Sequence, residues 1–165
     1  MGMVRRLLDL AGIGGERLHL QWVSSAEAQR FVDIARNAVE SVRELGPLDR
    51  SGLQMEIEAC AMTLNGETLR WLVGKEVRIT SKGDVYGRLW AVEKYESVLN
   101  NMLEREYQKN LIYLAVKEGR SSVRDISSRT GLGLKRVSYL LADLEKTKRV
   151  EFKGMKDRKP MFAAL

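Results

Sequence analysis

Residues 17–23 constrain the fold of this chain more than any other segment. Their apolar residues alternate with polar ones, in the period-2 pattern of a half-buried strand: Leu18, Leu20 and Trp22. Ser24 and Glu27 follow as an S-x-x-E capping box, which is typical of a helix N-terminus. A strand that runs directly into a helix usually belongs to a sheet of several strands. Here only about twenty residues precede it.

A lone strand leaves backbone N–H and C=O groups on both edges without partners. One strand with two helices cannot satisfy both edges or bury both of its faces. Residues 17–23 must therefore pair with the same segment of a second chain, pack against the middle helices, or stay loosely ordered. The predicted arrangement is a homodimer to which the middle helices contribute.

Helical spacing of apolar residues predicts that most of the remaining chain is helical. The helices expected before the C-terminal third cover residues 3–11, 25–45, 52–63, 67–79 and about 90–118. The glycine-rich residues 12–15 end the first of these helices, and the Gly46–Pro47 pair ends the second. Residues 81–87 ("SKGDVYG") carry turn residues and are expected to form a loop.

The strongest local pattern lies in the C-terminal third. A helix ends at Gly119, and Ser121 or Ser122 can cap the next helix, "VRDISSRT". After the tight turn "GLGL", a helix over about 134–147 carries one apolar stripe: Leu134, Val137, Leu140, Leu141 and Leu144. The last residues then indicate strand, turn and strand. Helix, helix–turn–helix and hairpin is the winged-helix order.

These patterns predict a mainly α protein with a little β, of the α+β class. Residues 1–48 are expected to form a truncated helix–strand–helix segment. Residues 49–107 are a helical connector, and residues 108–165 are a C-terminal winged-helix domain.

Charge is distributed unevenly along the chain. Residues 1–108 hold 14 Lys and Arg against 16 Asp and Glu, a net charge of −2. Residues 109–165 hold 14 against 6, a net charge of +8. A basic segment of this kind indicates a polyanionic or acidic partner. The alternative interpretation is a well-solvated surface.

In the DNA-binding use of a winged helix, the third helix lies in the major groove. The face of that helix opposite the apolar stripe, together with the hairpin turn, carries the predicted contact residues: Lys135, Arg136, Ser138, Tyr139, Lys156, Arg158 and Lys159. Other basic residues lie near them: Lys146, Lys148, Arg149 and Lys153. Such a surface suits either nucleic acid or protein, since winged helices also serve inside multiprotein machines.

The sequence contains one cysteine, Cys60, and one histidine, His19. One thiol cannot supply a four-cysteine iron–sulfur cluster or a zinc site, and we expect Cys60 to be a small buried hydrophobe and His19 to be structural. We find no acid–base pair, nucleophile–histidine set, Walker loop or dinucleotide fingerprint. The sequence therefore predicts a non-catalytic protein with no metal or cofactor held by this chain.

No apolar run approaches the ~20 residues of a membrane span, and the first residues lack the apolar core and cleavage site of a signal peptide. We therefore expect a cytoplasmic protein that makes no membrane contact.

The first 48 residues resemble the end of the delta subunit of methyl-viologen-reducing hydrogenase, a family also called the hydrogenase iron–sulfur subunit. Three blocks carry the resemblance: "AGIGGERL" (11–18), "QWVSSAEAQRF" (21–31) and "ELGPL" (44–48). Residues 70–76 ("RWLVGKE") and 84–87 ("DVYG"), followed by a winged helix, look like a C-terminal extension of some members.

This resemblance implies an accessory electron carrier in an α/β fold. The family passes electrons from a hydrogenase or another donor toward a flavin-containing heterodisulfide reductase, through a cysteine-bound [2Fe–2S] cluster. The present chain departs from that pattern, because it has none of the cluster cysteines and Cys60 lies beyond the matched blocks. No cluster-binding residue carries over to this sequence.

The resemblance also offers an account of the missing sheet, namely that it has been lost from this reading frame. The chain is then either a true gene remnant or the product of a start codon assigned downstream of a stop-like codon, for example a UGA that encodes selenocysteine in place of a family cysteine. The DNA upstream of Met1 distinguishes these two possibilities.

Two functional hypotheses follow. The first is a cluster-free relative or fragment of a hydrogenase delta subunit. It would act as an accessory or docking component of a hydrogenase–heterodisulfide reductase type electron-transfer complex, with hydrogenase or flavin-containing reductase subunits as partners. The alternative is a winged-helix DNA-binding transcriptional regulator.

Overall fold

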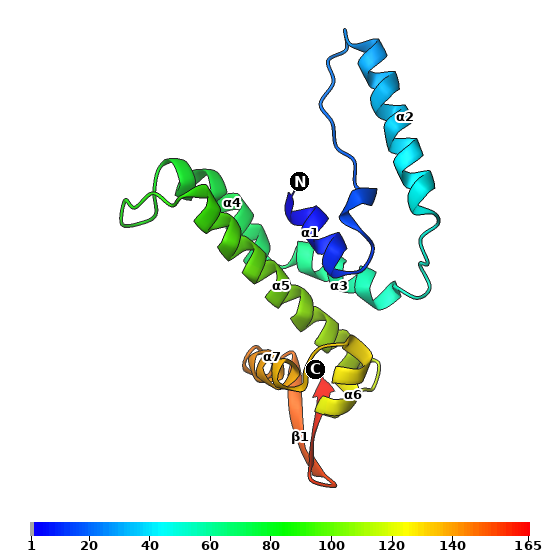
Figure 1. The fold of residues 1–165 in the computed structure, drawn as a ribbon. Helices are drawn as coiled ribbons and strands as arrows, with labels where there is room; N and C mark the ends of the chain where they lie inside the picture. The colour runs from blue at the N-terminus through cyan, green and yellow to red at the C-terminus, as the bar shows by residue number, and fades with distance from the viewer. Residues whose placement is uncertain (1) are drawn as a thin grey trace. The chain divides into compact units, whose positions relative to one another are not determined.

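The computed structural model describes residues 2–165, which divide into two compact units, Met1–Gln54 and Met55–Leu165. Seven α-helices and one two-stranded antiparallel sheet are described within residues 2–165 (Figure 1). The predicted class, mainly α with a little β, is confirmed. The division into three segments at residues 48 and 107 stays a prediction.

The first unit contains helix α1 (Gly2–Leu10), a 3-10 turn η1 (Gly15–Arg17) and helix α2 (Ala28–Leu45). Between α1 and η1 the backbone turns tightly, and the Gly15 N–H donates to Oδ1 of Asp9 at 2.6 Å. A Cβ atom at Gly15 would lie 2.8 Å from the carbonyl oxygen of Arg5. This close approach requires glycine, so the glycine-rich stretch shapes the turn as well as ending the helix.

The predicted strand over residues 17–23 is wrong. Arg17 belongs to η1, and residues 18–24 have no regular secondary structure, although they run in extended form beside α2 (Figure 1). Within the described residues, no hydrogen bond involves the backbone of residues 19–23. A strand needs a neighbouring strand for its ladder, and the described part of this unit contains none.

The capping box that the sequence predicts at the start of helix α2 forms only in part. The Glu27 carboxylate accepts the backbone N–H of Ser24 at 2.9 Å, which is the reach-back bond of a capping box. The Ser24 hydroxyl lies 3.4 Å from the N–H of Ala26, and the helix begins at Ala28 rather than residue 25. The Ser24 N–H and then the Arg30 guanidinium hold the pKa of Glu27 below its usual value.

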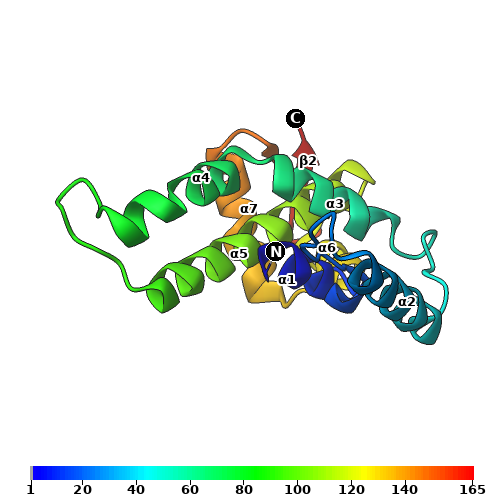
Figure 2. The ribbon, with the colours of Figure 1, turned by 90° about the horizontal axis from the view of Figure 1, so that it is seen from above.

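The second unit is built on the long helix α5 (Val92–Lys117), with helices α3 (Gln54–Asn65) and α4 (Glu67–Ser81) preceding it. Figure 2 shows α4 and α5 side by side, joined by the loop over residues 82–91. The hydroxyl of Tyr95, which is 1 % exposed, donates to the carbonyl of Leu72 at 3.0 Å and ties the two helices together. The predicted helices and the loop between them are therefore present.

Helices α6 (Val123–Thr130) and α7 (Leu134–Lys146) follow, and the chain ends in strands β1 (Val150–Lys156) and β2 (Lys159–Ala164). Ser122 is the cap of α6, since its hydroxyl accepts the N–H of Asp125 at 3.2 Å. Ser122 also forms an isolated antiparallel bridge with Met161, which attaches the hairpin to the start of α6. The order of these elements is the predicted one, and the assignment of a winged helix stays a prediction.

No helix among the described residues is both long enough and apolar enough to cross a bilayer. The structure of one chain does not test the predicted homodimer, which stays a prediction.

Candidate acidic-partner interface

Helix α7 packs against the rest of the second unit through a buried apolar face. Val137, Leu140, Leu141 and Leu144 are each at most 1 % exposed. Leu134, which the sequence places on the same stripe, is instead 51 % exposed at the first turn of the helix. Burial of this face fixes which side chains of α7 remain available to a partner.

Charged groups fix α7 against α5. The Asp143 carboxylate lies 3.1 Å from the Arg105 guanidinium and 3.4 Å from the Lys109 ammonium group. Burial alone would raise the pKa of Asp143, but the hydrogen bond from Arg105 and the charge of Lys109 lower it overall. Asp143 therefore attaches α7 to α5. Its negative charge is paired with Arg105 and Lys109.

On α7, the predicted contact residues differ in how accessible they are. Lys135, Ser138 and Tyr139 are exposed, whereas Arg136 is only half-exposed. The Arg136 Nε donates to the side-chain oxygen of Gln108 on α5 at 2.6 Å. The Arg105 guanidinium lies 5.6 Å from the centre of the Tyr139 ring. The cations at positions 105 and 136 therefore have protein partners, while Lys135 has its charge free for a ligand.

The hairpin turn presents three exposed cations. Lys156 pairs with Lys159 across the hairpin, and Asp157 and Arg158 form the two-residue turn between them. Both turn residues have positive φ, 50° and 61°, as a type I′ turn requires. Lys156, Arg158 and Lys159 therefore lie together at the turn of the hairpin.

The predicted contact residues thus form two groups, one on α7 and one at the hairpin turn. No hydrogen bond or ion pair among the described residues joins the two groups. We refer to the exposed members of both groups together as the basic surface: Lys135, Ser138, Tyr139, Lys156, Arg158 and Lys159. Its chemistry suits a ligand with several negative charges.

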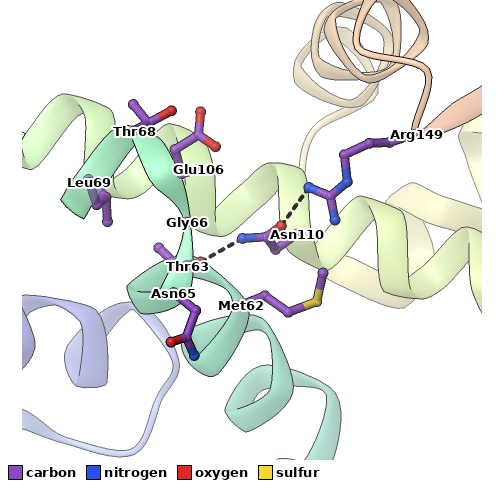
Figure 3. Close-up of a pocket in the computed structure, with 9 residues that line it drawn as sticks. All are labelled: Met62, Thr63, Asn65, Gly66, Thr68, Leu69, Glu106, Asn110 and Arg149. Carbon is purple, nitrogen blue, oxygen red and sulfur yellow. Dashed lines mark hydrogen bonds between the residues drawn. The ribbon is translucent and has the colours of Figure 1, made fainter. Parts of the chain in front are cut away.

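A polar network that sequence reasoning missed joins residues of α3 and α5 to Arg149, which directly precedes β1 (Figure 3). The Asn110 amide donates to the Thr63 hydroxyl at 2.9 Å and accepts from the Arg149 guanidinium at 2.8 Å. Arg149 also lies over the Tyr113 ring, 4.3 Å from its centre. The network borders a cavity of about 260 Å³. Arg149 is therefore a structural cation, although the sequence groups it with the surface lysines.

Asn110 offered a sequence signal for this network. It lies among apolar residues at helical spacing, between Tyr107 and Leu114, and is 4 % exposed. A polar side chain in such a stripe needs a hydrogen-bond partner inside the protein. The partners themselves, at positions 63 and 149, are too distant in sequence to be predicted.

Cys60 lies in α3, is 7 % exposed, and is the small buried residue that the sequence predicts. Burial, and then the charge of Glu56, raises the pKa of the Cys60 thiol to about 11. No cluster of His, Cys, Asp and Glu among residues 2–165 could hold a metal ion. The donors present do not fit a [2Fe–2S] cluster, which takes four cysteine ligands.

In the first unit, Arg17 connects segments that are far apart in sequence. Its guanidinium donates to the carbonyls of Leu45 and Gly46, at 3.0 and 2.9 Å. These carbonyls belong to the C-terminal end of α2, where cations are favoured. The blocks "AGIGGERL" and "ELGPL" are therefore in direct contact through Arg17.

Comparison with known proteins finds a similarity in this unit. The family model described as methyl-viologen-reducing hydrogenase, delta subunit, matches residues 1–46. The vhu iron-sulfur subunit of the F420-non-reducing hydrogenase of Methanococcus maripaludis is 40% identical over 43 residues. Its namesake from Methanocaldococcus jannaschii is 42% identical over 43 residues. No solved structure matches the chain significantly.

Each of these two similarities covers 26% of this chain and 32% of the relative. The chain therefore spans about a third of the length of the curated relatives that it matches. Residues 47–165 lie outside the family match. Over its first 46 residues, this chain is similar to the hydrogenase delta-subunit family.

Proposed function

We propose that this chain is an accessory component of a hydrogenase-associated electron-transfer complex. It would dock on hydrogenase subunits or on flavin-containing subunits of the heterodisulfide reductase type, without holding a cluster of its own. The observation that carries this proposal is the match of residues 1–46 to the hydrogenase delta-subunit family. The Arg17 contacts support it, since they join two of the three matching blocks.

The first unit is the part proposed to dock. Residues 19–23 have unpaired backbone groups, and α2 has no buried residue. The apolar side chains Leu20, Trp22 and Phe31 are 52, 83 and 63 % exposed. Exposed apolar side chains next to unpaired extended backbone are the features of a surface that a partner covers.

Affinity purification of the tagged chain from its own cells tests this proposal. We expect hydrogenase or flavoprotein reductase subunits to co-purify, identified by mass spectrometry and by the flavin absorbance of the eluate. A matched variant, Trp22→Ser with Phe31→Ser, should lose these subunits while keeping the circular dichroism of the parent. A parent preparation free of both kinds of subunit would contradict the proposal.

A second candidate function is DNA binding by residues 108–165, which would act as a winged-helix domain. The observation that favours it is the basic surface, with exposed cations both on α7 and at the hairpin turn. Lys and Arg in these positions could contact phosphates or guanine edges.

Salt dependence of binding to duplex DNA tests the second candidate. Phosphate contact makes log K fall with log salt at a slope of about −0.9 per phosphate neutralised. Alanine at Lys135, Arg158 and Lys159 should then flatten the slope and weaken binding. The control variant carries alanine at Lys75, Arg78 and Lys82, exposed or half-exposed cations of α4 and its end, and should bind unchanged. An unchanged slope in the first variant would remove the basic surface from consideration.

A further inference from the structure

A groove lies between helix α4, the loop over residues 82–91 and helix α5. Its volume is about 530 Å³, and its lining is almost entirely apolar, with Trp71, Leu72 and Ile79 from α4. Trp90 closes it from the loop, and Val98 lines it from α5. Grooves of this size with aromatic and aliphatic walls are typical binding sites.

The walls of the groove are fixed by bonds that span its elements. The backbone N–H of Trp90 donates to the carbonyl of Ile79 at 3.2 Å, and this bond connects the end of the loop to the end of α4. A Cβ atom at Gly83 would lie 3.0 Å from the backbone of Gly87. Gly83 has a φ of 97°, so both its conformation and its close approach require glycine. The loop therefore holds a defined shape without a ligand.

Asp84 organises the same loop from inside. Its carboxylate accepts the backbone N–H groups of Tyr86 and Arg88, at 2.8 and 3.0 Å, and pairs with the Arg88 guanidinium at 2.9 Å. These bonds, led by the Arg88 N–H, lower the pKa of Asp84 to about 2. Asp84 is the one acid that lines the groove, and its charge is already neutralised by Arg88.

Two cations line the groove without a partner. Lys75 is half-buried and Arg78 is exposed, and neither side chain forms a hydrogen bond or ion pair within the described residues. They lie on the same face of α4 as Trp71 and Ile79, at helical spacing. The groove thus combines an apolar floor with unpaired positive charge at its side.

Apolar exposure continues beyond the groove. The lining residues Val85 and Trp71 are 86 and 59 % exposed. Outside the lining, Tyr86 and Leu89 of the loop are 78 and 64 % exposed. A small molecule in the groove would leave these residues in water, whereas a macromolecular partner would cover them as well. The groove is concave and preformed, which suits a protruding helix with an apolar stripe.

We propose that this groove receives an amphipathic helix of a partner protein, with acidic residues beside its apolar stripe to pair with Lys75 and Arg78. The apolar stripe would fill the floor at Trp90 and Val98. Charge complementarity gives the acidic choice, because the groove offers two unpaired cations and no unpaired acid. This inference does not depend on the function proposed for residues 1–46, because the groove lies outside the family match.

Two synthetic helical peptides test the proposal. Both carry the same leucine stripe at i, i+3, i+4 and i+7; one has glutamate beside the stripe and the other has lysine. The protein carries Trp22→Phe, so that its tryptophan fluorescence reports Trp71 and Trp90 alone. We expect a blue shift on adding the glutamate peptide, and binding about tenfold tighter than that of the lysine peptide.

Charge reversal supplies the decisive variant. Lys75→Glu with Arg78→Glu should invert the preference between the two peptides, and both sites are accessible enough to tolerate the change. The matched control, Arg120→Glu with Arg124→Glu, reverses two exposed cations outside both the groove and the basic surface and should keep the original preference. Failure of the glutamate peptide to bind the parent, or equal affinity for both peptides, would overturn the proposal.

The substitution Val98→Asp also distinguishes two other possible occupants of the groove, a second copy of this chain and a lipid surface. Val98→Asp places a charge on the groove floor and should abolish binding of the glutamate peptide. If the same change abolished self-association of the chain alone, measured by sedimentation, the occupant would be a second copy. If it abolished binding to phosphatidylglycerol vesicles, the occupant would be a lipid surface. Either of these results would contradict the proposed helix.

Discussion

The two units of this chain differ in how well they bury their own apolar residues. In the second unit, α5 has ten buried residues, all apolar except Lys109 and Asn110, and α7 buries four apolar residues on one face. In the first unit, α2 is longer than α7 but has none. Both helices have an apolar face in the sequence, so helix amphipathicity alone does not determine burial. What differs is whether the chain supplies other elements to cover that face.

The largest expected effect comes from the core of the second unit. Leu140 is 0 % exposed, and Leu140→Ala should reduce the free energy of unfolding by about 2–5 kcal/mol, because it removes buried contacts and leaves a cavity. Urea unfolding followed by circular dichroism measures this. A loss below about 1 kcal/mol would mean that α7 is not packed as described.

A smaller loss is expected from the network around Asn110. Asn110→Ala removes the donor to the Thr63 hydroxyl and the acceptor of the Arg149 guanidinium, and should cost about 1–3 kcal/mol. Asn101→Ala is the control, since Asn101 is exposed on the same helix and its loss should change stability by at most about 0.5 kcal/mol. Equal effects of the two substitutions would show that the network adds nothing to stability.

Asp143→Asn should cost about 1 kcal/mol at neutral pH, through the lost ion pairs with Arg105 and Lys109. The pKa of Asp143 is lower in the folded than in the unfolded state. Its stabilisation is therefore complete above the unfolded pKa of about 3.9 and is lost as the pH falls through the folded pKa. Urea unfolding at neutral pH and below pH ~3 should show the gap between parent and variant closing in acid. A gap that widens in acid would reverse the assigned direction.

The smallest effect is expected in the first unit. Leu20 is 52 % exposed, so Leu20→Ala should change stability by no more than about 0.5 kcal/mol, although it removes the same atoms as Leu140→Ala. The two leucine variants compare the units under identical chemistry. A loss for Leu20 near that for Leu140 would show that residues 18–24 are covered in the isolated chain.

The same contrast explains which parts of the fold could be predicted from the sequence. The helices and the hairpin follow from local patterns, and their observed bounds differ little from those expected. The strand predicted at 17–23 is absent. The alternation of Leu18, Leu20 and Trp22 suits one strand of a larger sheet, and the described part of this unit contains no sheet. A strand depends on its neighbours in a way that a helix, which satisfies its own backbone, does not.

At the candidate interface, the exposure of the lysines could be predicted from the sequence, but the partners of the arginines could not. Exposure of Lys135 and of the turn cations follows from their place opposite an apolar stripe and in a two-residue turn. The partners of Arg136 and Arg149, which are Gln108 and Asn110, lie on α5 and are 28 and 39 residues away in sequence. Contacts at such separations arise from tertiary packing, so periodicity alone cannot distinguish a structural arginine from an available one.

Hydrogen–deuterium exchange of the purified chain, at a concentration where it is monomeric, tests the contrast between the units most directly. We expect the backbone amides of residues 19–23 to exchange at close to the rate of an unstructured peptide, while those of α5 and α7 are strongly protected. Protection of residues 19–23 comparable to that of α5 would contradict this expectation, since that segment would then have a partner within its own chain.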